Sequence, residues 1–148
     1  MRFAAHISSP DLIVDERRAR MPEVYAPEPK HGWCYYFEKA DLARQFDDWE
    51  EVVNIGDTAF KLDDDPHDPV ERFVFIEGYA HVGKWARALE LSQESYQASQ
   101  DDADLGRLLC QLWERIETET TESRPQLAEG VERSKTLSEV KSIFACNP

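Results

Sequence analysis

Apolar residues recur three and four positions apart along most of the chain beyond residue 32, which is the spacing of amphipathic α-helices. Five such stretches follow one another, separated by short segments rich in aspartate, proline or glycine. The stretches begin at Trp33, at Trp49, at Pro69, at Trp85 and just after Asp102. The sequence therefore predicts an all-α fold with about five main helices.

Start signals mark two of these helices. Asp48 is a favourable N-cap residue, and Glu51 stands three positions later, where it completes a capping box. Before the third helix, Asp68 is the expected cap, Pro69 takes the first helical position and Glu71 closes a second box. Both signals predict that a helix begins directly after the aspartate.

The chain divides into three segments by composition. Residues 1–30 hold several prolines and no sustained helical period, so we expect an extended N-terminal segment there. Residues 31–118 contain the five helices. Residues 119–148 begin with a polar stretch at 119–125, which is typical of a linker, and continue into a short C-terminal helix over Leu137–Phe144.

The first helix has apolar residues on two sides. One side carries Trp33 and Ala40, and the other carries Tyr35, Leu42 and Phe46. A helix that is apolar on two sides is typically buried on both. We therefore expect this helix to be covered on both sides.

The second and fourth helices each open with a tryptophan, and Trp49 and Trp85 lie 85 − 49 = 36 residues apart. A shift of this length aligns five further apolar pairs across both helices of a two-helix unit. These pairs are Phe37 with Phe73, Phe46 with Val82, Val52 with Ala88, Val53 with Leu89, and Phe60 with Tyr96. A helix pair that recurs at a period near 34 indicates a helical repeat protein.

This pattern resembles the tetratricopeptide repeat over residues 33–118. An aromatic residue opens the second helix of each unit and a smaller residue follows one turn later, as Trp49 with Val52 and Trp85 with Ala88. The resemblance implies antiparallel helix hairpins stacked as an α-solenoid.

The chain also departs from the family's pattern. Ile76 stands in the second unit where Ala40 supplies the family's small residue in the first, and the period exceeds the usual value of about 34. We therefore expect a divergent pair of units with the fifth helix as a cap. Because a stable array usually needs about three repeats, we expect the N-terminal segment or self-association to cover an exposed end.

In the tetratricopeptide family the first helix of each unit lines a concave groove, and such a groove suits a peptide segment. The resemblance implies that the groove residues here are Phe37, Asp41, Arg44 and Gln45 from the first unit, and Phe73, Glu77 and His81 from the second. The two phenylalanines would supply apolar anchors and the polar residues would select the partner. The alternative is an ordinary solvated surface with partly buried phenylalanines.

A second resemblance comes from the stretch HGWCYYFEKADLARQ at residues 31–45, followed by Asp48, Trp49 and Glu50. It is similar to soluble tails that follow the membrane spans of some bacterial glycosyltransferase-like membrane proteins. This resemblance implies an accessory or regulatory tail whose active site lies elsewhere, and it implies no catalytic residue in this chain.

The charge of the chain narrows the class of partner. Thirty acidic and 17 basic side chains give a formal net charge of −13. Nucleic acids and anionic membranes select for clustered lysine and arginine, so the charge argues against both and favours a basic protein partner. No apolar run approaches the ~20 residues that span a bilayer. We expect a soluble cytoplasmic protein, or the soluble domain of a membrane protein.

The densest cluster of possible metal ligands is Asp63, Asp64, Asp65 and Asp68 around His67. The cluster lacks the glycine and glutamate of a calcium-binding EF-hand loop, so we expect these aspartates to cap helices. The alternative is a small metal-dependent hydrolase. The sequence holds no Ser/His/Asp set, phosphate-binding glycine loop or dinucleotide fingerprint. We therefore expect a non-enzymatic protein-interaction module with no cofactor and no metal.

The three cysteines are Cys34, Cys110 and Cys146, an odd and widely scattered set that makes a poor disulfide framework. Cys34 and Cys110 stand in apolar runs, where cysteine usually acts as a small apolar side chain. Cys146 is expected to be an exposed thiol. These expectations favour a reducing compartment.

Overall fold

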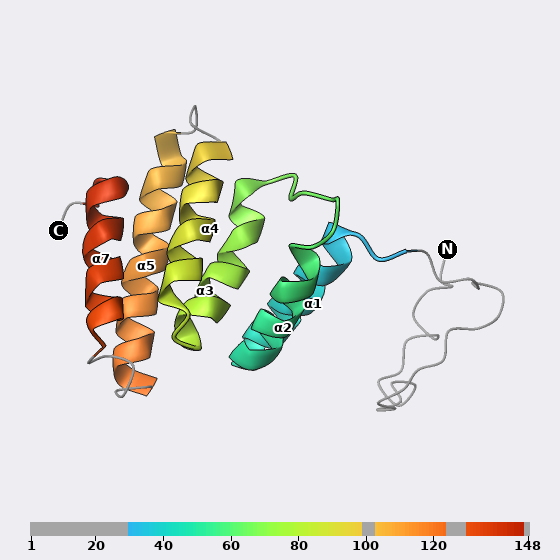
Figure 1. Cartoon of the computed structure of the whole chain (residues 1–148), viewed down its shortest axis with the longest axis horizontal. Coiled ribbons are helices and arrows are strands. Elements are labelled where there is room, and N and C mark those ends of the chain that lie inside the picture. Colours follow the sequence, from blue (N-terminus) through green and yellow to red (C-terminus); the bar gives the residue numbers. More distant parts are fainter. Residues whose placement is uncertain (1–29, 99–102, 124–129, 147–148) are drawn as a thin grey trace, which may run out of the picture. The chain divides into compact units, whose positions relative to one another are not determined.

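The computed structural model describes residues 30–98, 103–123 and 130–146. Helices make up most of this part of the chain, and no β-strand occurs in it, so the all-α prediction is confirmed for these residues. The helices of the described residues all lie in one unit of the chain, His31–Pro148. They are α1 (Trp33–Gln45), α2 (Trp49–Ala59), the 3₁₀ helix η3 (Pro69–Arg72), α3 (Phe73–His81), α4 (Trp85–Ala98), α5 (Ala103–Ser123) and α7 (Val131–Ile143) (Figure 1). The extended segment expected over residues 1–29 lies outside the described residues.

α1 and α2 form a hairpin through a tight turn. The chain reverses at Asp47, whose φ of 55° lies in the left-handed region, and N–H groups of the turn donate to carbonyl oxygens in the last turn of α1. Asp48 then caps α2, because its Oδ1 accepts a hydrogen bond from the backbone N–H of Glu51 at 3.2 Å. The predicted start of the second helix at Trp49 is confirmed.

The third helix begins with a single 3₁₀ turn before it continues as α3. Asp68 Oδ1 accepts a hydrogen bond from the N–H of Val70 at 2.9 Å, and Pro69 occupies the first helical position, as predicted. α3 and α4 are joined at Gly83, whose φ of 83° strongly favours glycine. α4 begins at Trp85, where the sequence placed it.

The linker predicted over residues 119–125 is wrong in its described part, because α5 continues as helix to Ser123. The hydroxyl groups of Thr118, Thr120 and Thr121 each donate to a carbonyl oxygen one turn earlier. These polar residues therefore extend the helix instead of ending it.

The predicted C-terminal helix exists but begins earlier than expected, at Val131 instead of Leu137. Its first turn carries Arg133, a buried residue whose Nη2 donates to the carbonyl oxygen of Glu117 at 3.0 Å and to Oγ1 of Thr121 at 2.8 Å. α7 packs against both α4 and α5.

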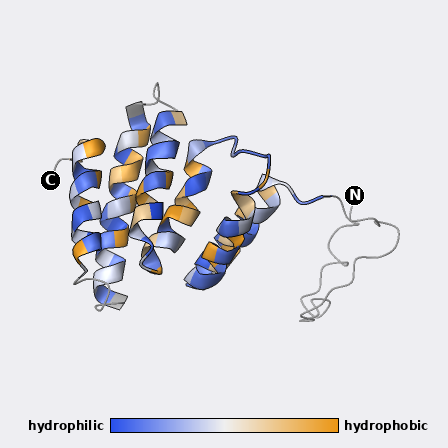
Figure 2. Ribbon diagram, in the orientation of Figure 1, coloured by the Kyte–Doolittle hydropathy of each residue, from blue (hydrophilic) through white to orange (hydrophobic). Residues whose placement is uncertain are grey.

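α3 is the most enclosed helix. It packs against α2 and α4, its neighbours in the chain, and also contacts α1 and α5. Every residue from Val74 to His81 is buried. Figure 2 shows that the ribbons of the other helices carry both hydrophobic and hydrophilic residues, in keeping with helices that have a buried and an exposed side.

Two glycines set the close approach of α2 and α3. A Cβ added to Gly78 would lie 3.0 Å from Cβ of Val52 and closer still to its Cγ1. A Cβ added to Gly56 would lie 2.9 Å from the ring of Phe75. The backbones can pack at this distance because both positions lack a side chain.

All four tryptophans of the chain are buried, and they mark where the helices meet. Trp49 and Trp85 are the first residues of α2 and α4, as the period of 36 predicts. Among the helices that the structure describes, none is both long and apolar enough to cross a membrane.

The expectation that α1 is covered on both sides is not met by the described residues. Trp33 and Ala40 are buried, but Tyr35, Leu42 and Phe46 are 38%, 55% and 76% exposed. The second apolar side of α1 is therefore accessible in the part of the chain that the structure describes.

The cysteine predictions are wrong at all three positions. Cys110 on α5 and Cys146, just beyond α7, form a disulfide across a sequence separation of 36 residues, with their Cα atoms 5.5 Å apart. Cys34 is free and exposed instead of buried. Sequence spacing missed the pairing because it depends on how α7 packs against α5, which is a tertiary feature.

Candidate partner-binding face

The three polar groove residues predicted on α1 form one hydrogen-bonded group. Arg44 donates to Oδ1 of Asp41 from Nε at 2.9 Å and from Nη2 at 2.7 Å. Nε2 of Gln45 donates to the other oxygen, Oδ2, at 3.0 Å. Burial acts to raise the pKa of Asp41, but the hydrogen bonds from Arg44 and Gln45 outweigh it and lower the pKa below its usual value. The Asp41 carboxyl is therefore ionised at neutral pH.

Glu77 on α3 is approached by arginines from two other helices. Its Oε1 accepts a hydrogen bond at 2.8 Å from Nε of Arg115 on α5, and a second from Nη2 of the same guanidinium. Nε of Arg44 on α1 lies 3.9 Å from the other oxygen, Oε2. Burial raises the pKa of the Glu77 carboxyl above its ordinary value, although both arginines act to lower it. One buried carboxyl group thus links α1, α3 and α5.

His81, at the C-terminal end of α3, is buried between α2 and α5. Its Nε2 lies 3.1 Å from Oε2 of Glu119 on α5. Its ring stacks on that of Trp49, with the centroids 3.9 Å apart and the planes inclined by 7°. Nε of Arg115 lies 4.0 Å from Oε1 of Glu119, so the polar contacts run without a break from Asp41 to His81.

We call these six connected residues the ionic network: Asp41, Arg44, Glu77, His81, Arg115 and Glu119. The two arginines are partly exposed, as are the carboxylates of Asp41 and Glu119. Glu77 and His81 are buried beneath them. The buried members fix the positions of side chains whose charged ends remain accessible to a partner.

Two members of the ionic network, Arg115 and Glu119, were missed by the sequence analysis. The fifth helix was treated as a cap, so none of its residues was assigned to the groove. Arg115 and Glu119 stand four positions apart on α5, a spacing that places opposite charges side by side on a helix. That spacing was the available signal, but it does not show which side of α5 faces α3.

The two predicted apolar anchors, Phe37 and Phe73, are half-buried and pack against the hydrophobic core. Each therefore presents only part of its ring to the surface. The predicted polar groove residues are therefore connected by hydrogen bonds and ion pairs, whereas the two phenylalanines offer only part of their surface to a partner.

The acidic loop between α2 and η3 holds the start of α1. Oδ2 of Asp64 accepts a hydrogen bond from the backbone N–H of Trp33 at 2.6 Å. Glu71 in η3 accepts a second hydrogen bond from the indole Nε1 of Trp33 at 2.7 Å. With Asp68 capping η3, two of the four aspartates predicted to cap helices, Asp64 and Asp68, accept a hydrogen bond from a backbone N–H at the start of a helix.

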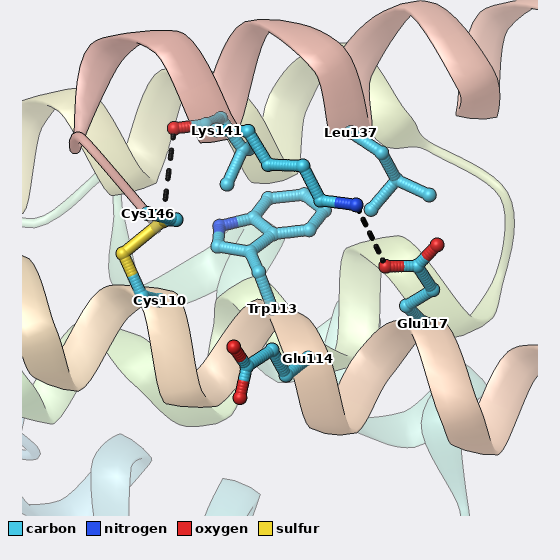
Figure 3. Close-up of a pocket in the computed structure, with 8 residues that line it drawn as sticks. Cys110, Trp113, Glu114, Glu117, Leu137, Lys141 and Cys146 are labelled. Carbon is cyan, nitrogen blue, oxygen red and sulfur yellow. Dashed lines mark hydrogen bonds and ion pairs between the residues drawn. A yellow bond between two sulfur atoms is a disulfide. The ribbon is translucent and has the colours of Figure 1, made fainter. Parts of the chain in front are cut away.

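A separate cavity of about 260 Å³ lies between α5 and α7 (Figure 3). In Figure 3 the ring of Trp113 rises from α5 toward α7 beside the disulfide, and Nζ of Lys141 lies 3.4 Å from Oε2 of Glu117. None of the predicted groove residues lines this cavity. Its lining residues are Cys110, Trp113, Glu114, Glu117, Leu137, Val140, Lys141 and Cys146.

Comparisons of the chain with models of protein families, with curated proteins and with solved structures found no match.

Proposed function

We propose that this chain is a non-enzymatic protein-interaction module that binds an extended peptide segment of a partner across α1, α3 and α5. The observation that carries the proposal is the ionic network, which connects these three helices through Glu77. A buried carboxyl group is costly to desolvate, and a well-packed apolar residue often stabilises a fold as well. The buried carboxyl group of Glu77 lies beneath partly exposed charged side chains, which favours partner binding as the role of this face.

The tetratricopeptide-like interpretation supports the same face. In such an array, α1 and α3 are the first helices of two successive units, and α5 is the capping helix that follows the second unit. First helices line the concave surface of stacked repeats. We include in the proposal that the hairpins α1–α2 and α3–α4 are divergent repeats of this kind.

The charges of the ionic network indicate the chemistry of the peptide. Arg44 and Arg115 offer guanidinium groups, which bind carboxylates in a bidentate manner. Asp41 and Glu119 offer carboxylates to basic side chains, and the net charge of −13 favours a peptide with more basic than acidic residues. The proposed ligand is therefore a peptide of mixed charge with an excess of lysine or arginine.

Selection from a displayed library of random peptides tests this proposal. We expect enrichment of mixed-charge peptides that bind the purified chain, with affinity measured by calorimetry. The double variant Arg44→Glu with Phe73→Ala reverses one charge on the face and removes one partial anchor from it. Its affinity for the selected peptides should fall at least about tenfold, which corresponds to about 1.4 kcal/mol.

A matched control is Arg107→Glu, which makes the same change of charge on the exposed side of α5, where Arg107 pairs with Asp104. This variant should bind the selected peptides like the wild type. Thermal melts followed by circular dichroism establish that each variant is folded. Equal affinities for all three proteins, or no enriched peptide, would refute the proposed face.

A further inference from the structure

α1 carries an accessible apolar stripe on the side away from the core. Tyr35, Leu42 and Phe46 are spaced by seven and four residues, which places them on one side of the helix. They are 38%, 55% and 76% exposed. Lys39 lies on the same side, and its Nζ is 5.5 Å from the centre of the Tyr35 ring. We call these four residues the α1 stripe.

The opposite side of α1 is fully used by the fold. Trp33 and Ala40 are buried, and α1 packs there against α2 and α3. No helix of the described chain covers the α1 stripe. Large apolar side chains grouped on a surface usually mark an interaction site. We therefore expect a partner surface to cover the α1 stripe.

The charge of α1 differs from that of the whole chain. Its two acidic residues, Glu38 and Asp41, are balanced by Lys39 and Arg44, giving 2 − 2 = 0 over Trp33–Gln45. The chain as a whole carries −13. Charge repulsion between two copies is therefore weak where their α1 helices meet, and the exposed side chains of Glu38 and Lys39, on the side of the α1 stripe, offer both signs of charge to the other copy.

We propose that the α1 stripe is covered by the α1 stripe of a second copy, in an antiparallel pair related by a two-fold axis. The stripe has an aromatic residue at each end and Leu42 between them. An antiparallel pairing places Tyr35 of one copy against Phe46 of the other at both ends. Leu42 and the aliphatic stem of Lys39 then pack near the axis. A two-fold contact of this kind uses one self-complementary surface.

The expected association is weak, because one helix of 13 residues supplies the contact. Such a helix is only about 20 Å long, and interfaces at the small end of the range are typically transient. This surface is distinct from the ionic network, so a dimer leaves the proposed peptide-binding face accessible.

Sedimentation equilibrium of the full chain over a range from about 1 μM to about 1 mM tests the proposal. The wild type should show a reversible monomer–dimer equilibrium. Leu42→Lys should be monomeric at every concentration, because the antiparallel pairing places residue 42 of one copy against Lys39 of the other and so brings like charges together near the axis. Val131→Lys is the matched control, since Val131 on α7 is 86% exposed but lies off the α1 stripe; it should dimerise like the wild type.

Mixing two charged variants tests the antiparallel arrangement. Tyr35→Lys and Phe46→Glu should each weaken dimerisation at least about tenfold when studied alone. An equimolar mixture should form a heterodimer, because the introduced lysine of one copy then faces the introduced glutamate of the other. The mixture should lose this advantage at about 1 M salt, where the Debye length is near 3 Å.

Two results would overturn the proposal. The first is a wild-type chain that stays monomeric up to about 1 mM, which would leave residues 1–29 or a different protein as the occupant of the α1 stripe. The second is a dimer that persists in Leu42→Lys, which would place the self-association elsewhere. A mixture of the two charged variants that remains monomeric would exclude the antiparallel pairing.

Discussion

The ring of His81 stacks face to face on the indole of Trp49, with the centroids 3.9 Å apart. A related arrangement occurs 36 residues later, where the guanidinium carbon of Arg133 lies 5.9 Å from the ring centre of Trp85. Both tryptophans begin a helix and both are buried. The covering group comes from α3 in the first case and from α7 in the second, so the two hairpins are closed by different helices.

Replacing His81 tests how much this stacked contact stabilises the fold. His81→Ala removes a buried ring from between α2 and α5 together with its contact to Glu119. We expect the free energy of unfolding in urea to fall by about 2 kcal/mol. His67→Ala, at an exposed histidine in the acidic loop, is the control and should change it by less than about 0.5 kcal/mol. Equal effects at the two positions would contradict a packing role for His81.

Replacing glycine by alanine should change the stability in opposite directions at Gly78, where α3 packs closely on α2, and at Gly106 on α5. Gly78→Ala brings a Cβ into collision with Val52, and we expect a loss of at least about 2 kcal/mol of stability. Gly106→Ala on α5 meets only ordinary contacts, the nearest being 3.4 Å from the ring of Tyr96. Alanine favours a helix interior over glycine by up to about 1 kcal/mol, so this variant should be at least as stable as the wild type. Chemical denaturation of both variants measures the difference.

The disulfide between Cys110 and Cys146 should stabilise the fold substantially. It closes a loop of 36 residues, for which the loss of chain entropy in the unfolded state corresponds to about 4 kcal/mol. We expect Cys146→Ser, or treatment of the wild type with a dithiol reductant, to lower the free energy of unfolding by about 2–4 kcal/mol. Cys34→Ser should have almost no effect because Cys34 is exposed and free. The disulfide assignment would be wrong if reduction left the melting curve unchanged.

Glu77 predicts a dependence of stability on pH. Burial raises the pKa of its carboxyl in the folded chain above the ordinary value of 4.5. The folded state therefore holds this proton more tightly than the unfolded state. The resulting stability is fully present below about pH 4.5 and is lost as the pH rises through the raised pKa.

Glu77→Gln isolates this effect, because glutamine does not titrate. The free energy of unfolding of the wild type minus that of Glu77→Gln should fall as the pH rises above the ordinary value of 4.5. Urea titrations of both proteins at a series of pH values from 4.5 upward give the difference. A difference that rises with pH would mean that Arg44 and Arg115 together outweigh burial.

Helix starts that depend on neighbouring residues were predicted well. Helix ends that depend on packing between distant helices were not. Asp48 and Asp68 cap where they were expected to, because an N-cap depends only on the next few residues. The end of α5 and the start of α7 were wrong. Thr120 was placed in the predicted linker but is buried in α5. Arg133 precedes the predicted start of the C-terminal helix, but it is buried in the first turn of α7 and its guanidinium group lies over the ring of Trp85.

The candidate site was predictable in its α1 part only. Asp41, Arg44 and Gln45 meet through helical spacing alone, which the sequence displays. The meeting of Glu77 with Arg115 depends on how α5 packs against α3, across 38 residues of sequence. No local pattern contains that information.

The most direct test of the proposed binding face is an NMR titration of the chain with a selected peptide, followed through the arginine side-chain Nε–H signals. We predict that the signals of Arg44 and Arg115 shift on binding, since both guanidinium groups are partly exposed on this face. The signals of Arg133, a buried residue in the first turn of α7, and of the indole N–H of Trp113 should stay in place. Shifts at Arg133 and Trp113 with none at Arg44 and Arg115 would contradict the account and place the peptide at α5 and α7.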